Sequence, residues 1–141
     1  MGSHFMANTT STVLTILIAW ALLLLILMEV LRTRLVISGA VTGPQLRPDN
    51  ANLSPFMQRL ARAQANCVEG LPIFGGLLIV ALVTDRAVVT NGLAPWLLVA
   101  RLLQSLVHLG SLSVIAVNVR FMAFTVQMAI GAYWCWALLL R

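Results

Sequence analysis

Long apolar stretches alternate with short polar segments along the chain. The apolar stretches run from about Thr12 to Leu31, from about Leu60 to Thr84, from about Leu93 to Ala116 and from about Phe121 to Leu140. A helix needs ~20 mostly apolar residues to cross the hydrocarbon core of a bilayer. Lipid leaves only helices or closed barrels as spanning structures, and these runs are too long and continuous for barrel strands. The pattern therefore predicts an all-α fold, an integral membrane bundle of four transmembrane helices. Ser54 and Pro55 are predicted to be the N-cap and first turn of the second helix.

The composition agrees with a membrane location. Of the 141 residues, 60% are hydrophobic and only 9% are charged, and the mean hydropathy is +0.96. A soluble domain of this size would be less apolar. Residues 1–6, MGSHFM, look like a cloning scar. No long soluble segment remains, so we expect residues 7–141 to form a single domain.

The formal charge of +5 comes from arginine, and its placement indicates topology. Five arginines lie in or beside the first loop, and Arg120 marks the third loop; the five are Arg32, Arg34, Arg47, Arg59 and Arg62. Basic loops stay in the cytoplasm. We therefore expect a multi-pass protein of a bacterial inner membrane or an endoplasmic-reticulum-type membrane, with loops one and three cytoplasmic. The arginines do not cluster among stacking aromatics, so nucleic acid is not an expected partner.

Two cysteines occur, one in the second apolar stretch and one in the fourth. Cys67 and Cys135 are too far apart to form a metal-binding motif, and we expect no metal. Free cysteine is among the most buried residue types. Both are therefore predicted to be buried free thiols.

Polar residues form one stripe on each of the two central helices. At ~100° per residue, the second stretch places Arg59, Arg62, Asn66 and Glu69 in one narrow sector. The third stretch does the same with Arg101, Gln104, Ser105, His108 and Ser111. A charge at the bilayer centre costs ~2.5–3.5 kcal/mol on insertion scales, and this cost falls when the charge is paired inside the bundle. We therefore predict that the stripes face each other and that Glu69 and Arg101 form an ion pair. Spacing alone leaves two roles open, a structural one that fixes helix register and a functional one.

The segment from Arg62 to Glu69, RAQANCVE, together with Pro72 and Phe74, resembles a known signature. It is similar to the second-helix motif of the MAPEG family, the membrane-associated proteins in eicosanoid and glutathione metabolism. A second match follows in Ala100-Arg101, His108 and Arg120-Phe121, in the order seen in the family's third and fourth helices. The resemblance covers nearly the whole chain.

Three positions differ from the eicosanoid-synthesising members. Gly70, Gln104 and His108 stand where those members usually carry an aromatic residue or, in one case, histidine. The chain thus resembles the general or bacterial-type branch of the family.

The resemblance implies a homotrimer with sites between neighbouring subunits on the cytoplasmic side. It implies glutathione as co-substrate, and a lipophilic small-molecule electrophile that enters from the membrane lipid. Arg120 would activate the thiol as the catalytic residue, helped by its place at the start of the fourth helix. The ligand-binding residues would be Arg32 or Arg34, Arg62, Gln64, Asn66, Glu69 and His108. The implied activity is that of a membrane-bound glutathione transferase or peroxidase, with detoxification as its role.

Two other functions remain open from the sequence. A non-catalytic member of the family would keep the scaffold and bind lipid or another thiol. A small proton-coupled transporter would use Glu69 as its proton site. The expected ion pair, the long first loop and the lack of repeat symmetry weigh against the transporter.

Overall fold

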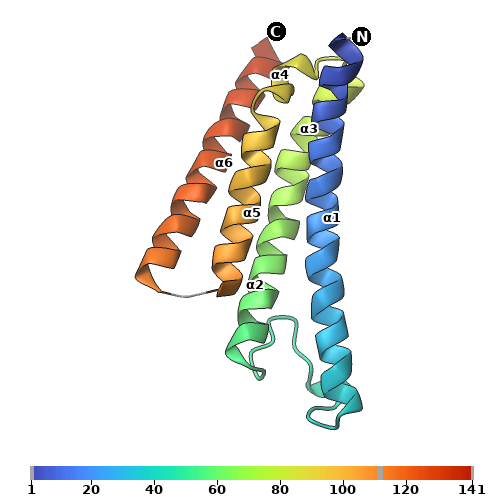
Figure 1. Cartoon of the computed structure of the whole chain (residues 1–141), viewed down its shortest axis with the longest axis vertical. Coiled ribbons are helices and arrows are strands. Elements are labelled where there is room, and N and C mark those ends of the chain that lie inside the picture. Colours follow the sequence, from blue (N-terminus) through green and yellow to red (C-terminus); the bar gives the residue numbers. More distant parts are fainter. Residues whose placement is uncertain (1, 111–112, 141) are drawn as a thin grey trace.

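The computed structural model describes the backbone of residues 2–110 and 113–140, and the side chains of residues 9–110 and 113–140 (Figure 1). All regular structure in these ranges is helical, which confirms the predicted all-α class. The elements are α1 (Gly2–Ile37), η1 (Gly43–Gln45), α2 (Pro55–Gly70), η2 (Leu71–Gly75), α3 (Gly76–Val83), α4 (Val88–Asn91), α5 (Ala94–Gly110) and α6 (Val114–Leu140).

Three of the described helices are long and apolar enough to cross a membrane. They cover Thr9–Ile37, Pro55–Val83 and Val114–Leu140. The third predicted stretch is shorter than expected, because α5 has 17 residues and ends at Gly110 rather than near Ala116. At 1.5 Å per residue, its length is about 25 Å, somewhat less than the ~30 Å hydrocarbon core. A membrane crossing by α5 therefore stays a prediction.

The long helices run alongside one another, and the two termini lie at the same end (Figure 1). The first loop, the C-terminal end of α5 and the N-terminal end of α6 lie at the opposite end (Figure 1). α5 packs against both α2 and α6, whereas α6 contacts α3 and α4 near its C-terminal half. The other end of α6 leans away from α2 in the same view.

The second helix begins as the sequence predicts. Ser54 is the N-cap, since its hydroxyl accepts a hydrogen bond from the Met57 amide at 3.3 Å, and Pro55 occupies the first turn. Pro72 lies inside the apolar run, where it has no amide hydrogen to donate and its ring crowds the preceding turn. The chain passes it in the π-helical turn η2 and continues as α3.

The last helix begins earlier than predicted. α6 starts at Val114, not near Phe121, because the Ser113 hydroxyl accepts from the Ala116 amide at 3.2 Å and acts as its N-cap. Arg120 is thus the seventh residue of α6. The prediction that it marks the third loop, at a helix start, is wrong. The first helix also extends beyond its predicted end, so Arg32 and Arg34 belong to the last turns of α1.

Candidate functional site

The two predicted polar stripes face each other across α2 and α5, apart from Ser111, which lies outside the described residues. The Asn66 side-chain amide lies 3.4 Å from Nδ1 of His108, and the thiol of Cys67 lies 3.2 Å from the Ser105 hydroxyl. Arg101 donates from Nη1 to the backbone oxygen of Asn66 at 3.2 Å. These polar groups therefore join the two helices inside the protein.

Three arginines lie within electrostatic range of His108. Arg59, Arg62 and Arg120 lie close enough to act on its ring electrostatically, and we call these three residues the arginine cluster. The Asn66 amide nitrogen can only donate, so Nδ1 of His108 accepts and the ring hydrogen is on Nε2. Nε2 of His108 and Nε of Arg120 are both buried and without a hydrogen-bond partner. This end of the site is positively charged and has unused donors.

Arg59 has a further contact that fixes its position. Its Nε donates to the backbone oxygen of Leu109 at 3.0 Å, in the last turn of α5. Its guanidinium also stands 5.9 Å from the centre of the Phe56 ring. A cation at a helix C-terminus is favourable because it interacts with the unpaired carbonyls there. Arg59 therefore links α2 to the end of α5 and helps to hold the site in place.

A pocket of about 410 Å³ opens between α2 and α6, and we call it the α2–α6 pocket. Small-molecule pockets are typically ~300–1,000 Å³. Its polar residues are Asn66, Glu69, Arg101 and Gln104. The rest of its wall is mainly apolar and includes Ile73, Phe74, Leu77, Phe124 and Met128. The pocket can hold a ligand that has both polar and apolar parts.

The predicted ion pair between Glu69 and Arg101 is not formed in this chain. Among the described residues, the only ion pair is that of Arg32 with Glu29, at 3.1 Å. Glu69 lies on the exposed side of the helix, whereas Arg101 is only 5% exposed. The Arg101 guanidinium contacts the backbone of Asn66 and the Phe74 ring instead. Helical spacing correctly placed both residues on the facing polar stripes, but it does not fix where long side chains point.

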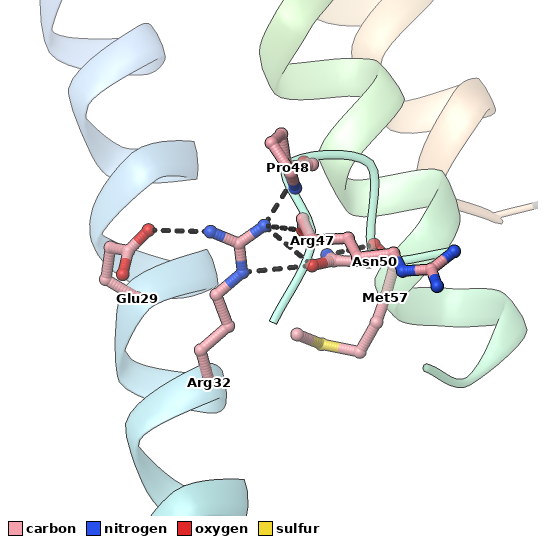
Figure 2. A network of polar contacts seen from close by, with 6 residues as sticks. All are labelled: Glu29, Arg32, Arg47, Pro48, Asn50 and Met57. Atoms are coloured by element: carbon pink, nitrogen blue, oxygen red, sulfur yellow. Dashed lines mark hydrogen bonds and ion pairs between the residues drawn. The ribbon is translucent and has the colours of Figure 1, made fainter. Parts of the chain in front are cut away.

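Arg32 organises the first loop (Figure 2). Its Nε donates to Oδ1 of Asn50 at 2.9 Å, and its Nη2 donates to the backbone oxygens of Arg47 at 2.8 Å and Pro48 at 3.1 Å. Its Nη1 pairs with Glu29. Asn50 also donates to the Met57 carbonyl at 2.7 Å and so ties the loop to α2. All three guanidinium nitrogens of Arg32 are thus engaged within the chain.

Three other predicted ligand-binding residues lie outside the pocket wall. Arg34 and Arg62 are exposed and Gln64 is half-buried. Their side chains have no hydrogen-bond partner within the part of the chain that the structure describes. Neither Arg32 nor Arg34 lines the α2–α6 pocket; Arg34 lines a separate groove beside the first loop. In a single chain, the structure therefore assembles Asn66, Glu69 and Arg101 in the pocket wall, whereas the α1 arginines, His108 and Arg120 do not line it.

Two residues of α6 were missed or misjudged from the sequence. Gln127 is fully buried, and its Nε2 donates to Oε1 of Gln104 at 2.9 Å. It lies seven residues after Arg120, so helical spacing would have placed the two on one face. Cys135 was predicted to be buried, but it is exposed and lines the α2–α6 pocket. Cys67 is buried as predicted.

Comparison with known proteins agrees with this architecture. The model of the MAPEG family matches residues 10–140, which include all the helices that form the site. No curated protein and no solved structure shows significant similarity to the chain. A match over nearly the whole sequence shows the family. The chain belongs to the MAPEG family.

Proposed function

We propose that the protein is a membrane-bound glutathione transferase or peroxidase that activates the glutathione thiol for attack on a lipophilic electrophile. The observation that carries the proposal is a pair of buried side-chain donors without partners near the arginine cluster: Nε2 of His108 and Nε of Arg120. A buried donor without an acceptor costs ~1–3 kcal/mol, and more when it is charged. Such donors are expected to receive acceptor atoms from a ligand.

Glutathione matches this set of donors in charge. It carries two carboxylates, one ammonium and a thiol, and an arginine binds a carboxylate with two parallel hydrogen bonds. The arginine cluster and His108 offer the positive groups, and Glu69 offers an acceptor for the ammonium. The apolar part of the α2–α6 pocket, near Phe124 and Met128, would take the electrophile. Asn66 connects the two parts, because it lines the pocket and contacts His108.

Arg120 is the proposed activating residue. The thiolate is the nucleophile, and a free thiol has a pKa of ~8.5, so most of it is protonated at neutral pH. A fixed guanidinium beside the sulfur stabilises the thiolate. The sulfur then forms a bond to the electrophilic atom as the leaving group departs. With the start of α6 at Val114, the stabilisation comes from the Arg120 charge rather than from the helix terminus.

We also propose that the working form is a homotrimer with sites shared between subunits. Arg34 and Gln64 do not line their own chain's pocket. A neighbouring subunit would bring its own Arg34 and Gln64 toward the arginine cluster. This arrangement explains how residues that are apart in one chain can serve one ligand.

The test is glutathione titration of the detergent-purified protein, with thiolate followed by its ultraviolet absorbance at neutral pH. We expect thiolate in the parent and in the control Arg47→Ala, which removes an exposed loop arginine. Arg120→Ala should form no thiolate while its glutathione affinity stays within about tenfold, or 1.4 kcal/mol. Unchanged thiolate formation in Arg120→Ala would mean that another residue activates the thiol. No binding and no thiolate in the parent would favour the non-catalytic alternative.

One observation bears on the transporter alternative. Glu69 is not paired with Arg101 in the chain, so that argument against a proton site no longer holds. Proton-coupled uptake into vesicles that disappears in Glu69→Gln would support a transporter. Uptake that does not depend on Glu69 would leave the transferase as the better assignment.

A further inference from the structure

The Arg101 guanidinium lies in the wall of the α2–α6 pocket without a carboxylate bound to it. Its Nη1 donates to the Asn66 backbone, and the guanidinium stands 5.9 Å from the centre of the Phe74 ring. Its Nη2 is buried and has no hydrogen-bond partner. An arginine stays charged and presents five N–H donors. A buried positive group therefore keeps unused donors beside an open pocket.

Gly70 provides the space that this guanidinium occupies. A Cβ added to Gly70 would lie 2.3 Å from Nη2 and 3.2 Å from Cζ of Arg101. The backbone of Gly70 is ordinary right-handed helix, with φ −77° and ψ −23°, so its conformation does not require glycine. The reason for glycine here is the close approach of Arg101. Any larger residue would displace the guanidinium from its place on the pocket wall.

The rest of the pocket fits an apolar body. Ile73 of η2 and Leu77 of α3 line it on one side, and Phe124 and Met128 line it from α6. Three of these four side chains, Ile73, Phe124 and Met128, are exposed in the single chain, so the apolar wall is open to a ligand. A neutral hydrocarbon would leave the Arg101 donors unsatisfied. A ligand with an anionic end and an apolar body would satisfy both parts.

We propose that Arg101 is the binding site for the anionic head group of an amphiphilic ligand whose apolar part fills the α2–α6 pocket. A carboxylate is the head group that suits a guanidinium best. Glu69 lines the same pocket and is the internal competitor for these donors. The inference rests on the proposed function in one respect, because it names the class of the lipophilic second substrate.

The first test compares two probes that differ only in charge. Equilibrium dialysis of radiolabelled dodecanoate and dodecanol against the detergent-purified protein, corrected with empty micelles, gives both affinities. We expect dodecanoate to bind at least about tenfold more tightly than dodecanol. Arg101→Gln keeps a donor for the Asn66 carbonyl but has no charge, so this preference should fall to within about twofold. Equal binding of the probes by the parent, or an undiminished preference in Arg101→Gln, would overturn the proposal.

A second pair of variants moves the guanidinium without removing its charge. Gly70→Ala should displace it and reduce the preference for dodecanoate. Gly76→Ala is the matched control, because a Cβ there meets nothing within 4 Å. A preference retained in Gly70→Ala would overturn the assigned role of Gly70. A preference lost equally in Gly76→Ala would show that the effect is not local to Arg101, against the proposal.

Glutathione titration of the same preparations separates the two proposals. Thiolate formation without any dodecanoate preference would reject the anionic site and leave the transferase standing. A dodecanoate preference that depends on Arg101, with no glutathione binding, would support the anionic site in a protein that is not a glutathione transferase. Slower alkylation of the exposed Cys135 by N-ethylmaleimide in the presence of dodecanoate would place the probe in the pocket. Unchanged alkylation at saturating dodecanoate would place it elsewhere and count against the proposal.

Discussion

Asn66 on α2 and His108 on α5 are joined by a side-chain contact of 3.4 Å. The contact links the centres of the two polar stripes, and it leaves Nε2 of His108 as an unused donor beside the arginine cluster. Asn66 also lines the α2–α6 pocket, so it belongs to both halves of the site. Asn66 therefore connects the polar end of the site, at His108, with the mainly apolar α2–α6 pocket.

Replacing Asn66 with leucine should weaken both the fold and the site. His108 would lose its partner at Nδ1, and we expect a loss of about 1–3 kcal/mol of unfolding free energy for the unsatisfied buried group. Thermal unfolding in detergent measures this loss, and glutathione titration measures the effect on binding. Asn118→Leu makes the same change at an exposed position of α6 and should leave both unchanged. Equal melting of the two variants would show that the Asn66–His108 contact has no energetic importance.

The variant Glu69→Gln tests whether Glu69 forms the ion pair with Arg101 that the sequence predicted. If Glu69 formed a buried ion pair with Arg101, its loss would cost ~3–5 kcal/mol. The structure has Glu69 exposed and unpaired, and surface substitutions usually change stability by no more than ~0.5 kcal/mol. We therefore expect the variant to melt like the parent and to lose glutathione affinity alone. A large drop in melting temperature would instead indicate that Glu69 and Arg101 do form an ion pair.

The helices could be predicted because apolar length and arginine placement leave few alternatives. Ser54 and Pro55 correctly predicted the start of α2. The capping residue Ser113 was not recognised in the sequence, so the predicted start of α6 was seven residues late. Helical spacing correctly brought the two polar stripes together. Contacts between long side chains were harder to predict. The engagement of Arg32 by Asn50 depends on the path of an irregular loop that no periodicity describes.

Asn50 should be important for the first loop for two separable reasons. Its backbone is left-handed, with φ 55°, and its buried side chain bonds both Arg32 and the Met57 carbonyl. Asn50→Ala loses the hydrogen bonds and also places an alanine in a conformation that costs ~1–2 kcal/mol. Asn50→Gly loses the bonds but tolerates the backbone. Both variants should open the loop to limited proteolysis, with the alanine variant the less stable by about 1 kcal/mol.

An exposed asparagine nearby provides the control for this pair. Asn52→Ala removes one hydrogen bond, from Nδ2 to the Gln45 carbonyl at 2.9 Å, from a side chain that is exposed and not part of the Arg32 network. Its proteolysis rate should stay close to that of the parent. If Asn52→Ala and Asn50→Ala were cleaved equally fast, the loop would not depend on the Arg32–Asn50 contact.

Arg86 should hold the C-terminal end of α6 in place. Its Nη1 and Nη2 donate to the backbone oxygens of Leu138 at 2.7 Å and Ala137 at 2.8 Å, where a helix has unpaired carbonyls. A cation at this position interacts favourably with the helix dipole. In Arg86→Ala we expect faster hydrogen exchange in the last turn of α6, measured by mass spectrometry of C-terminal peptides, and a loss of about 1–2 kcal/mol of unfolding free energy. Arg47→Ala, on the exposed first loop, should change neither quantity. Exchange that remained as slow as in the parent would mean that packing around the fully buried Trp134, and not Arg86, keeps this end of the helix ordered.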